Sequence, residues 1–337
     1  MNVLGIETSC DETAAAVVQD GRVVRSNLIS SQEHLHERFG GVVPEVASRA
    51  HLEAINPIVE AALQEAGCGF GDLDAVAVTA GPGLVGALLV GMAGAKALAF
   101  GLGVPFVAVN HLEGHIFANV LAGASIDEPF VAFLVSGGHT MLVHVPEPFD
   151  YRVLGQTVDD AAGEAFDKVA RFLGLGFPGG PVLDRLARDG DPGAVRFPRA
   201  VTHGRFDFSL SGLKTAVVRH VKAERAAGRE TPAADVAASF QEAVVEVQVD
   251  KTMAAARETG VRTVVLGGGV VANTRLRALM SERAEAEGVT LRIPPLALCT
   301  DNGAMIAAAG YARLQRGERS AFDVRADPGM RLEPASP

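Results

Sequence analysis

The segment Asn110-His111-Leu112-Glu113-Gly114-His115 places two histidines four residues apart, a spacing that suits metal binding. On a helix, His111 and His115 lie on the same face one turn apart, so both imidazoles can reach one metal ion. Asp301, in the distant segment Cys299-Thr300-Asp301-Asn302-Gly303, would complete a set of two histidines and one carboxylate. Such a set leaves coordination positions open for a substrate, so these residues predict a metal centre with a chemical role.

The glutamate between the two histidines does not fit a zinc protease. In that class the glutamate follows the first histidine directly, where it can act on a metal-bound water. Glu113 lies two residues from each histidine instead, roughly 200° around a helix with the usual turn. We therefore expect Glu113 to point away from the metal, which disfavours a metalloprotease.

Two glycine-rich segments are candidates for phosphate binding. Ser136-Gly137-Gly138-His139-Thr140 lies between two apolar strands, and Gly267-Gly268-Gly269 lies between a strand and a helix. Adjacent glycines let backbone amides approach a phosphate, and a helix N-terminus favours negative charge. Taken alone, paired glycines are often ordinary turn residues, and neither segment matches the dinucleotide fingerprint or a P-loop. Together they favour a nucleotide cleft between two related domains.

Acidic residues gather in two other segments. Glu7-Thr8-Ser9-Cys10-Asp11-Glu12-Thr13 carries three carboxylates between two predicted strands, which an ordinary solvated hairpin would also explain. Asp159 to Lys168 concentrates acids ahead of a helix, where they commonly serve as partners of the helix dipole. The glycine-rich segment Gly174 to Pro181 follows and suggests backbone shaped around a ligand, with Asp184 just inside the next helix.

Residues 185–229 contain ten basic residues against four acidic ones, a local charge of +6 in a protein with a formal net charge of −10. This segment is a candidate surface for the phosphate backbone of a nucleic acid. A solvated helical face explains the same pattern equally well.

The elements that must position these residues follow an α/β pattern, because short apolar strands alternate with longer helical patterns. Both halves open with a strand, a polar turn and a second strand: Met1 to Ile6 with Ala14 to Gln19, and Phe130 to Val135 with Met141 to Val145. We therefore expect two α/β domains of similar design, residues 1–128 and residues 129–337. The last helix, at about 303–316, could pack back on the first domain.

The composition favours a cytoplasmic protein without membrane association. Cys10, Cys68 and Cys299 form no CxxC pair, and their odd count argues for a reducing compartment. The N-terminus begins directly with a predicted strand rather than with a basic and then apolar leader. No apolar run is expected to reach the length of a membrane span, because glycines and Lys96 interrupt the stretch from Leu84 to Leu102.

Two further long motifs, Gly40-Gly41-Val42-Val43-Pro44-Glu45 and Ala80-Gly81-Pro82-Gly83-Leu84-Val85-Gly86, stand beside the segments around His111 and Asp301. In this order the motifs resemble the TsaD family of tRNA N6-adenosine threonylcarbamoyltransferases, formerly described as O-sialoglycoprotein endopeptidases. The resemblance runs from Val3 to about Tyr311. It implies the fold of the actin, Hsp70 and sugar-kinase superfamily, in which two duplicated, ribonuclease H-like domains surround a cleft for nucleotide and metal.

The resemblance also implies roles for particular residues. His111, His115 and Asp301 would bind the metal, which in the family is usually assigned as iron. Asp11 and Glu12 match acidic positions beside the reaction centre and are the candidate catalytic residues. The residues expected to line the substrate are Leu134, Val135, Ser136, Gly137, Gly138, Asp167, Gly180, Asp184 and Asn273.

Departures from the family pattern are few. Phe177 stands where tyrosine is common, Leu210 where phenylalanine is common, and Val271 where serine is expected. The last departure could alter contacts near the nucleotide, but none of the three removes an expected ligand.

The reaction implied by the resemblance is an acyl transfer. The threonylcarbamoyl group of threonylcarbamoyl-AMP would pass to N6 of the adenosine beside the anticodon in tRNAs reading ANN codons, with AMP as the leaving group. One divalent metal ion, iron(II) or alternatively zinc, would be the cofactor, and binding of ATP or ADP with Mg²⁺ stays open. The implied partners are tRNA, a TsaB-like paralogue and a small TsaE-like ATPase. A small-molecule kinase of the same superfamily and a nucleotide-regulated scaffold are the alternative functions.

Overall fold

The computed structural model describes residues 1–200 and 202–332, which form two compact units. Unit 1 consists of Met1–Ser125 and Pro294–Leu332, and unit 2 runs from Ile126 to Ile293. The arrangement differs from the expected domain of residues 129–337, because the whole segment 294–332 belongs to unit 1 rather than its helix alone. Residues 201 and 333–337 of that expected domain lie outside the described residues.

Unit 1 is built around a five-stranded sheet with the strand order β3-β2-β1-β4-β5. Its strands are β1 (Asn2–Glu7), β2 (Glu12–Gln19), β3 (Val23–Ser31), β4 (Ala75–Gly81) and β5 (Phe106–Asn110). Its helices are α1 (Glu33–His36), α2 (Pro44–Ala66), α3 (Val85–Leu102), α4 (His111–Leu121) and α10 (Gly303–Gln315). Leu4 and Ile6 of β1 share a core with residues of α2 and α3, while α10 packs against β1, β2 and β4. Because elements cover both faces of the sheet, β1 and β4 are almost continuously buried.

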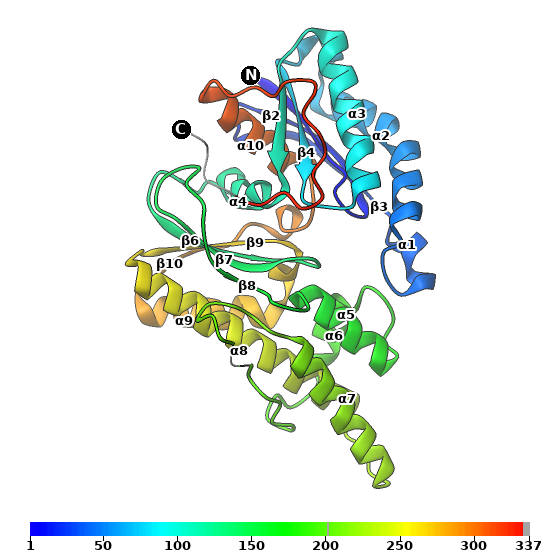
Figure 1. The fold of residues 1–337 in the computed structure, drawn as a ribbon, viewed down its shortest axis with the longest axis vertical. Coiled ribbons are helices and arrows are strands. Elements are labelled where there is room, and N and C mark those ends of the chain that lie inside the picture. Colours follow the sequence, from blue (N-terminus) through cyan, green and yellow to red (C-terminus); the bar gives the residue numbers. More distant parts are fainter. Residues whose placement is uncertain (201, 333–337) are drawn as a thin grey trace. The chain divides into compact units, whose positions relative to one another are not determined.

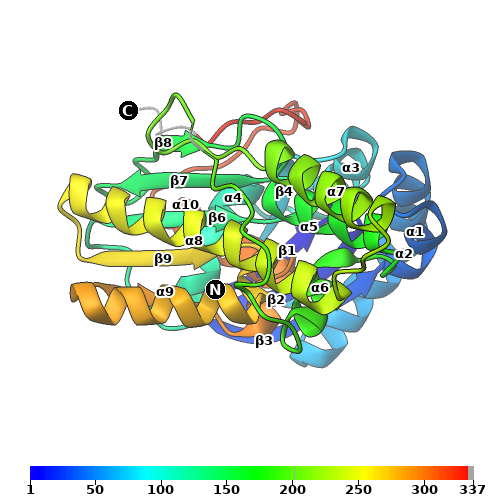
Figure 2. The same ribbon diagram turned by 90° about the horizontal axis from the view of Figure 1, so that it is seen from below.

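Unit 2 repeats this plan with the strand order β10-β9-β6-β7-β8. Its strands are β6 (Phe130–Val135), β7 (Thr140–Val145), β8 (Arg152–Gln156), β9 (Thr263–Gly267) and β10 (Thr290–Arg292). Its helices are α5 (Ala162–Leu173), α6 (Gly179–Ala187), α7 (Ser211–Ala226), α8 (Ala233–Thr259) and α9 (Thr274–Glu287). The long helices α8 and α9 run alongside β9, as Figure 2 shows.

The two sheets have the same topology. In each, the first strand of the unit pairs antiparallel with the second, which pairs antiparallel with the third, and on its other side the first strand pairs in parallel with the fourth. The fifth strand then extends the parallel side. The hairpins β1–β2 and β6–β7 are the two strand, turn and strand segments expected from the sequence. Their equivalent positions indicate a duplicated α/β fold.

Helix α10 approaches β1 closely because both carry glycine at the contact, and Figure 1 shows them beside each other. A Cβ atom added to Gly5 would lie 2.1 Å from the carbonyl oxygen of Gly303 and 2.5 Å from the amide nitrogen of Ala307. No side chain fits at that distance. The helix start is fixed as well, because the buried Asn302 side chain accepts a hydrogen bond from the Met305 amide at 3.0 Å. These contacts hold Asp301, the residue before the cap, against the sheet.

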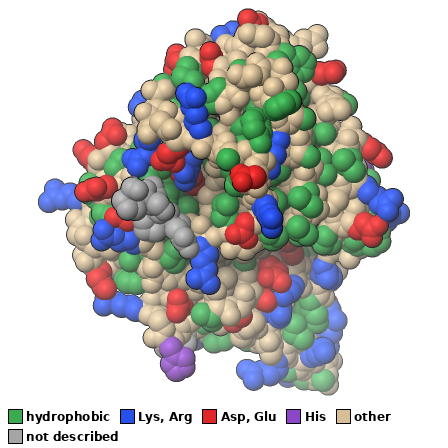
Figure 3. All heavy atoms as spheres, turned by 45° about the horizontal axis from the view of Figure 1, so that its top comes forward, with side chains coloured by type: hydrophobic (Ala, Val, Ile, Leu, Met, Phe, Trp, Pro, Cys, Tyr) green, Lys and Arg blue, Asp and Glu red, His purple; other side chains and the backbone are tan. Residues whose placement is uncertain are grey.

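Helix α3 is, among the described residues, the one helix long and apolar enough to cross a membrane by length and composition, with 18 residues and a mean hydropathy of 1.8. This corrects the expectation that no apolar run reaches that length. One such helix is a weak indication of a membrane span, and residues of α3 including Met92, Ala95 and Ala99 are part of the core of unit 1. Other residues of α3 stay exposed, and Figure 3 shows hydrophobic side chains lying between charged ones on the molecular surface.

Asp159 ties the start of α7 to the segment that precedes α5. Its carboxylate accepts hydrogen bonds from the hydroxyl groups of Ser209 and Ser211, at 2.6 and 2.7 Å, and from the Leu210 amide at 2.8 Å. Burial raises the pKa of Asp159, but these hydrogen bonds outweigh it and lower the pKa to about 2.

The lowered pKa predicts how this contact depends on pH. Because the folded pKa lies below the ordinary value of 3.8, the stabilisation is present above pH 3.8 and is lost as the pH falls through about 2. We expect Asp159→Asn to be less stable than the unmodified protein at neutral pH and the difference to shrink across that window. Urea unfolding of both proteins at a series of pH values measures this. A difference that does not change with pH would contradict the prediction.

Candidate metal centre

Strand β5 runs directly into helix α4, and this junction sets the positions of both histidines. Asn110 ends the strand, and its side chain caps the helix by accepting a hydrogen bond from the Leu112 amide at 2.9 Å. His111 is therefore the first residue of α4, and His115 follows one turn later on the same face. Both are buried, as are the other residues of α4 from His111 to Asn119. Asp301 reaches them from the turn before α10, so all three lie within unit 1.

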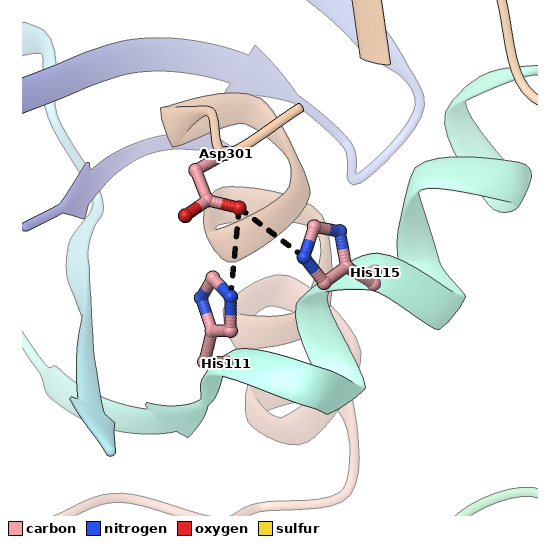
Figure 4. Close-up of side chains that lie close together, drawn as sticks. All are labelled: His111, His115 and Asp301. Atoms are coloured by element: carbon pink, nitrogen blue, oxygen red, sulfur yellow. Dashed lines mark ion pairs between the residues drawn. The ribbon is translucent and has the colours of Figure 1, made fainter. Parts of the chain in front are cut away.

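The three side chains converge, as Figure 4 shows. Asp301 Oδ1 lies 3.5 Å from His111 Nε2 and 3.3 Å from His115 Nε2. One ligand atom from each residue lies within 4.8 Å of the other two. Ligands bound at about 2.0–2.2 Å from a common ion have comparable separations, so the group could hold a metal.

Glu7, the last residue of β1, holds His111 in place. Its Oε2 lies 2.9 Å from His111 Nδ1, and Ser9 Oγ lies 3.2 Å from the same nitrogen. Glu7 is fully buried and also accepts hydrogen bonds from Thr79 Oγ1 and the Ser9 amide, both at 2.5 Å. With Nδ1 engaged in this way, Nε2 of His111 is the nitrogen directed at Asp301. A carboxylate that holds the far nitrogen of a metal-binding histidine is a common feature of metal sites.

The charges around His111 favour a cation. Burial lowers the pKa of His111, but the negative charges of Asp301 and Glu7 outweigh it and raise the pKa to about 9. Burial, together with the charges of Asp301 and Asp11, raises the pKa of Glu12 well above its usual range. Neutral histidine and ionised carboxylate are the forms that bind a metal ion, and such an ion would offset this concentration of negative charge.

His115 gives a second test of whether these residues fit a metal. Both of its ring nitrogens are buried without a hydrogen-bond partner among the described residues, although Nε2 lies 3.3 Å from Asp301. A buried polar atom without a partner costs roughly 1–3 kcal/mol. A metal ion bound at Nε2 would satisfy that nitrogen, so the donor set and its surroundings fit a metal centre.

Asp11 directly precedes β2 and Glu12 is the first residue of that strand, so both belong to the segment that begins with Glu7. Buried His51 of α2 anchors this segment, because its Nδ1 lies 2.7 Å from Thr13 Oγ1 and its Nε2 lies 2.9 Å from the Cys10 carbonyl oxygen. The negative charge of Asp301 contributes to the raised pKa of Glu12, so the two carboxylates are close enough to interact electrostatically. The segment is therefore an anchored part of the centre rather than a solvated hairpin.

Glu113 contacts α10 instead of the metal ligands. Its buried Oε2 lies 2.9 Å from Arg313 Nε and 2.8 Å from Arg313 Nη2. This ion pair fastens α4, which carries both histidines, to α10, which follows Asp301. It agrees with the expectation that Glu113 does not act on a metal-bound water.

Sequence reasoning did not identify Glu7 as part of the centre. The available signal was a carboxylate directly after a buried apolar strand, but only the folded chain places it beside His111. We expect Glu7→Gln to weaken metal binding about 10- to 100-fold, the usual effect of losing such a partner. Titration with Co²⁺, followed by its absorption spectrum, measures the affinity. Glu53→Gln, on an exposed position of α2, is the matched control, and equal affinities of Glu7→Gln and the unmodified protein would exclude this role for Glu7.

In unit 2 the expected phosphate-binding turns lie at the ends of two paired strands. Leu134 of β6 pairs with Gly267 of β9, and Val135 is the last residue of β6. The turn of Ser136, Gly137 and Gly138 follows, and a Cβ atom on either glycine would have no heavy atom within 4 Å. Gly268 has a φ of +101°, and a Cβ there would lie 2.3 Å from the Val135 carbonyl oxygen. Glycine is thus required where the two turns meet.

The other residues expected to line the substrate connect the helices of unit 2. Asp167 of α5 accepts a hydrogen bond from the Gly179 amide at 2.7 Å, beside Gly180. Asp184 of α6 accepts one from Thr274 Oγ1 at 2.8 Å, and Asn273 caps α9 through the Leu276 amide at 2.9 Å. The structure therefore links these residues through local hydrogen bonds, while their contact with a substrate stays a prediction.

The repeated sheets define the class of the protein, a duplicated α/β fold of the actin-like type, and unit 1 adds a candidate metal centre. Solved structures agree on the fold. Full-length HypF has a TM-score of 0.61 at 15% identity, covering 95% of this chain but only 47% of HypF. Component A of (R)-2-hydroxyglutaryl-CoA dehydratase from Acidaminococcus fermentans has a TM-score of 0.54 at 16% identity, covering 94% of this chain and 99% of that one.

Sequence comparison identifies the family. The family model for TsaD, tRNA N6-adenosine threonylcarbamoyltransferase, matches residues 23–308. Relatives with that name are 55% identical in Desulfitobacterium hafniense (strain Y51), over 98% of each chain, and 57% identical in Anaeromyxobacter dehalogenans (strain 2CP-C), over 98% of this chain and 99% of that one. The chain belongs to the TsaD family and is a transferase of tRNA modification. The comparisons give no support to a small-molecule kinase or a scaffold.

Proposed function

We propose that this protein transfers the threonylcarbamoyl group of threonylcarbamoyl-AMP to N6 of the adenosine next to the anticodon in tRNAs reading ANN codons, releasing AMP. The proposal rests on family membership along nearly the whole chain, joined to the His111, His115 and Asp301 group in unit 1. The product, threonylcarbamoyladenosine, would be made in the cytoplasm, which agrees with three cysteines that form no disulfide.

His111, His115 and Asp301 would hold one divalent metal ion, for which we propose iron(II) with zinc as the alternative. When bound, the ion would supply Lewis-acid chemistry, polarising the threonylcarbamoyl carbonyl or anchoring the threonyl group. Glu7 orients the imidazole of His111, and the Glu113–Arg313 pair keeps the helix of the two histidines in position.

The chain's other residues would bind the adenylate and accept a proton. We assign the adenylate to Leu134, Val135 and the turn of Ser136 to Gly138. Asp167, Gly180, Asp184 and Asn273, which local hydrogen bonds hold between the helices of unit 2, would complete the lining. Binding of ATP or ADP with Mg²⁺ by the same residues is a further part of the proposal. Asp11 or Glu12 would take the proton that N6 of adenosine loses as the new carbon–nitrogen bond forms.

A TsaB-like paralogue would bind the exposed apolar residues of α2 and α3. Gly86 lies against Ser48, and Gly94 lies against Ile55, so the two helices run side by side with Leu52 and Leu89 between these contacts. Leu52 is 64% exposed and Leu89 is 55% exposed, so the two helices present neighbouring apolar side chains that a partner could cover. A TsaE-like ATPase would complete the system.

The variant Leu89→Glu tests the surface proposed for the paralogue. We expect this variant to lose the complex with the TsaB-like paralogue, and sedimentation of the mixed proteins measures this.

Mass spectrometry of tRNA nucleosides tests the proposed reaction. Unmodified ANN-reading tRNA would be incubated with threonylcarbamoyl-AMP, this protein and the two partners, beside a tRNA carrying guanosine in place of the target adenosine. We expect threonylcarbamoyladenosine only in the first tRNA. If the Desulfitobacterium hafniense relative makes the product in the same mixture and this protein makes none, the proposed function is wrong.

A further inference from the structure

Helix α7 in unit 2 has two faces of opposite character. The residues Leu213, Val217 and Val221 recur every four positions and are buried. The opposite face carries Arg219, Lys222 and Arg225, which are all exposed. At 100° of rotation per residue about the helix axis, the three side chains fall within an arc of about 120°. The remaining residues of this outer face are small or uncharged, so it contains no carboxylate.

Ion pairing separates these three cations from most of the basic segment around them. Of the ten basic residues between 185 and 229, five lie in ion pairs with carboxylates of the same unit: Arg188, Arg199, Arg205, Lys214 and Arg229. Arg219, Lys222 and Arg225 lie in none among the described residues. The acid nearest to them in sequence, Glu224, is engaged by Arg229 at 2.7 Å. Of the ten basic residues in this segment, five therefore lie outside ion pairs among the described residues, and three of these five share one helix face.

No other helix in the described part of the chain carries three cations outside ion pairs, and the protein as a whole is acidic, with a net charge of −10. The C-terminal end of α7 extends past α5 and α6 of the same unit, as Figure 1 shows. Exposed alanines, Ala223 and Ala226, lie among the cations, so a ligand can approach the helix closely. The face therefore fits a polyanion with regularly spaced charges.

We propose that the outer face of α7, formed by Arg219, Lys222 and Arg225, binds the phosphate backbone of tRNA. This inference rests on the proposed function, which makes tRNA the substrate, and adds where the tRNA contacts the chain. Long basic side chains with no carboxylate partner contact phosphates without a competing internal ion pair. Because such contacts carry no base information, the surface would bind substrate and non-substrate tRNAs alike and would position the tRNA rather than select it.

The salt dependence of tRNA binding tests this surface in the full chain. The variant Arg219→Gln/Lys222→Gln/Arg225→Gln keeps residues that favour a helix, and Arg205→Gln/Arg257→Gln removes two exposed cations of the same unit that are paired. A third variant, Arg219→Lys/Arg225→Lys, keeps the charge. For each protein, the dissociation constant of tRNA that lacks the threonylcarbamoyl group is measured from low to high salt. Formation of threonylcarbamoyladenosine by the protein without substitutions is measured beside it.

We expect the slope of log affinity against log salt to fall by about one for each phosphate that the variant no longer neutralises, hence by up to about three in the glutamine variant. The paired-cation control and the lysine variant should keep the original slope. An unchanged slope in the glutamine variant, while the unmodified protein binds and modifies tRNA, overturns this surface and leaves the proposed function intact. If the unmodified protein neither binds nor modifies tRNA with active partners, the function itself fails. An equal fall in slope in the paired-cation control would also overturn the assignment to α7.

Discussion

Replacing His111 and His115 together by alanine is expected to abolish metal binding and formation of threonylcarbamoyladenosine. The double variant leaves Asp301 as the only ligand of the group, and one carboxylate holds a divalent ion far more weakly than a three-ligand set. Since loss of a residue that merely orients a ligand costs about 10- to 100-fold in metal affinity, loss of two ligands should exceed that range. Metal content by mass spectrometry and product formation measure the two effects.

A matched control replaces two histidines outside the centre. His34 and His203 are both exposed, and His34→Ala/His203→Ala should keep the metal content and the activity of the unmodified protein. The informative contrary result is a double variant of His111 and His115 that carries no metal and still forms product. That result would remove the metal from the mechanism while leaving the transferase activity in place.

Arg313→Leu is expected to destabilise unit 1 by about 3–5 kcal/mol, the usual cost of breaking a buried ion pair from one side. The reason is the environment of Glu113, whose side chain is 0% exposed while Arg313 is 22% exposed. Removing the guanidinium leaves a buried carboxylate without the partner that lies 2.8 Å away. Urea unfolding measures the free energy of unfolding. Because the chain has two units that can unfold separately, the measured signal must come from unit 1, which contains both residues.

Two further variants make this prediction specific. Arg49 of α2, in the same unit, pairs with Glu45 on the surface, so Arg49→Leu should cost no more than about 1 kcal/mol. The double variant Glu113→Leu/Arg313→Leu removes both charges, and it should recover much of the lost stability because no unpaired charge stays buried. A double variant as unstable as Arg313→Leu would mean that packing, rather than the ion pair, fastens α4 to α10.

The metal centre could be predicted from the sequence only in part. The four-residue spacing of His111 and His115 carries its own geometry, because a helix places such residues on one face whatever surrounds it. Asp301 required the family pattern, since 185 residues lie between it and His115 and local periodicity says nothing about so distant a contact. Glu7 and His51 were not identified as parts of the centre, because their roles depend on contacts that form only when β1, α2 and α4 pack together.

The fold shows the same division. Buried strands such as β1, β2 and β6 were predicted within two residues of their ends, because their apolar runs are long and uninterrupted. The exposed edge strand β3 and the three-residue strand β10 were not predicted, because neither contains a run of apolar residues that distinguishes it from a loop. The return of residues 294–332 to unit 1 depends on the glycine contact between β1 and α10, which no local pattern reveals.

The sequence by itself determined the α/β class, the duplicated hairpins, the histidine pair and the family, because each depends on local periodicity or on motif order. Tertiary structure alone decided which carboxylate holds His111, which arginine neutralises Glu113, and which cations of the basic segment stay outside ion pairs. The physical reason is common to all three. A charge acts according to the partner a few ångströms away and the water excluded around it, and the chain sets both only when distant segments pack.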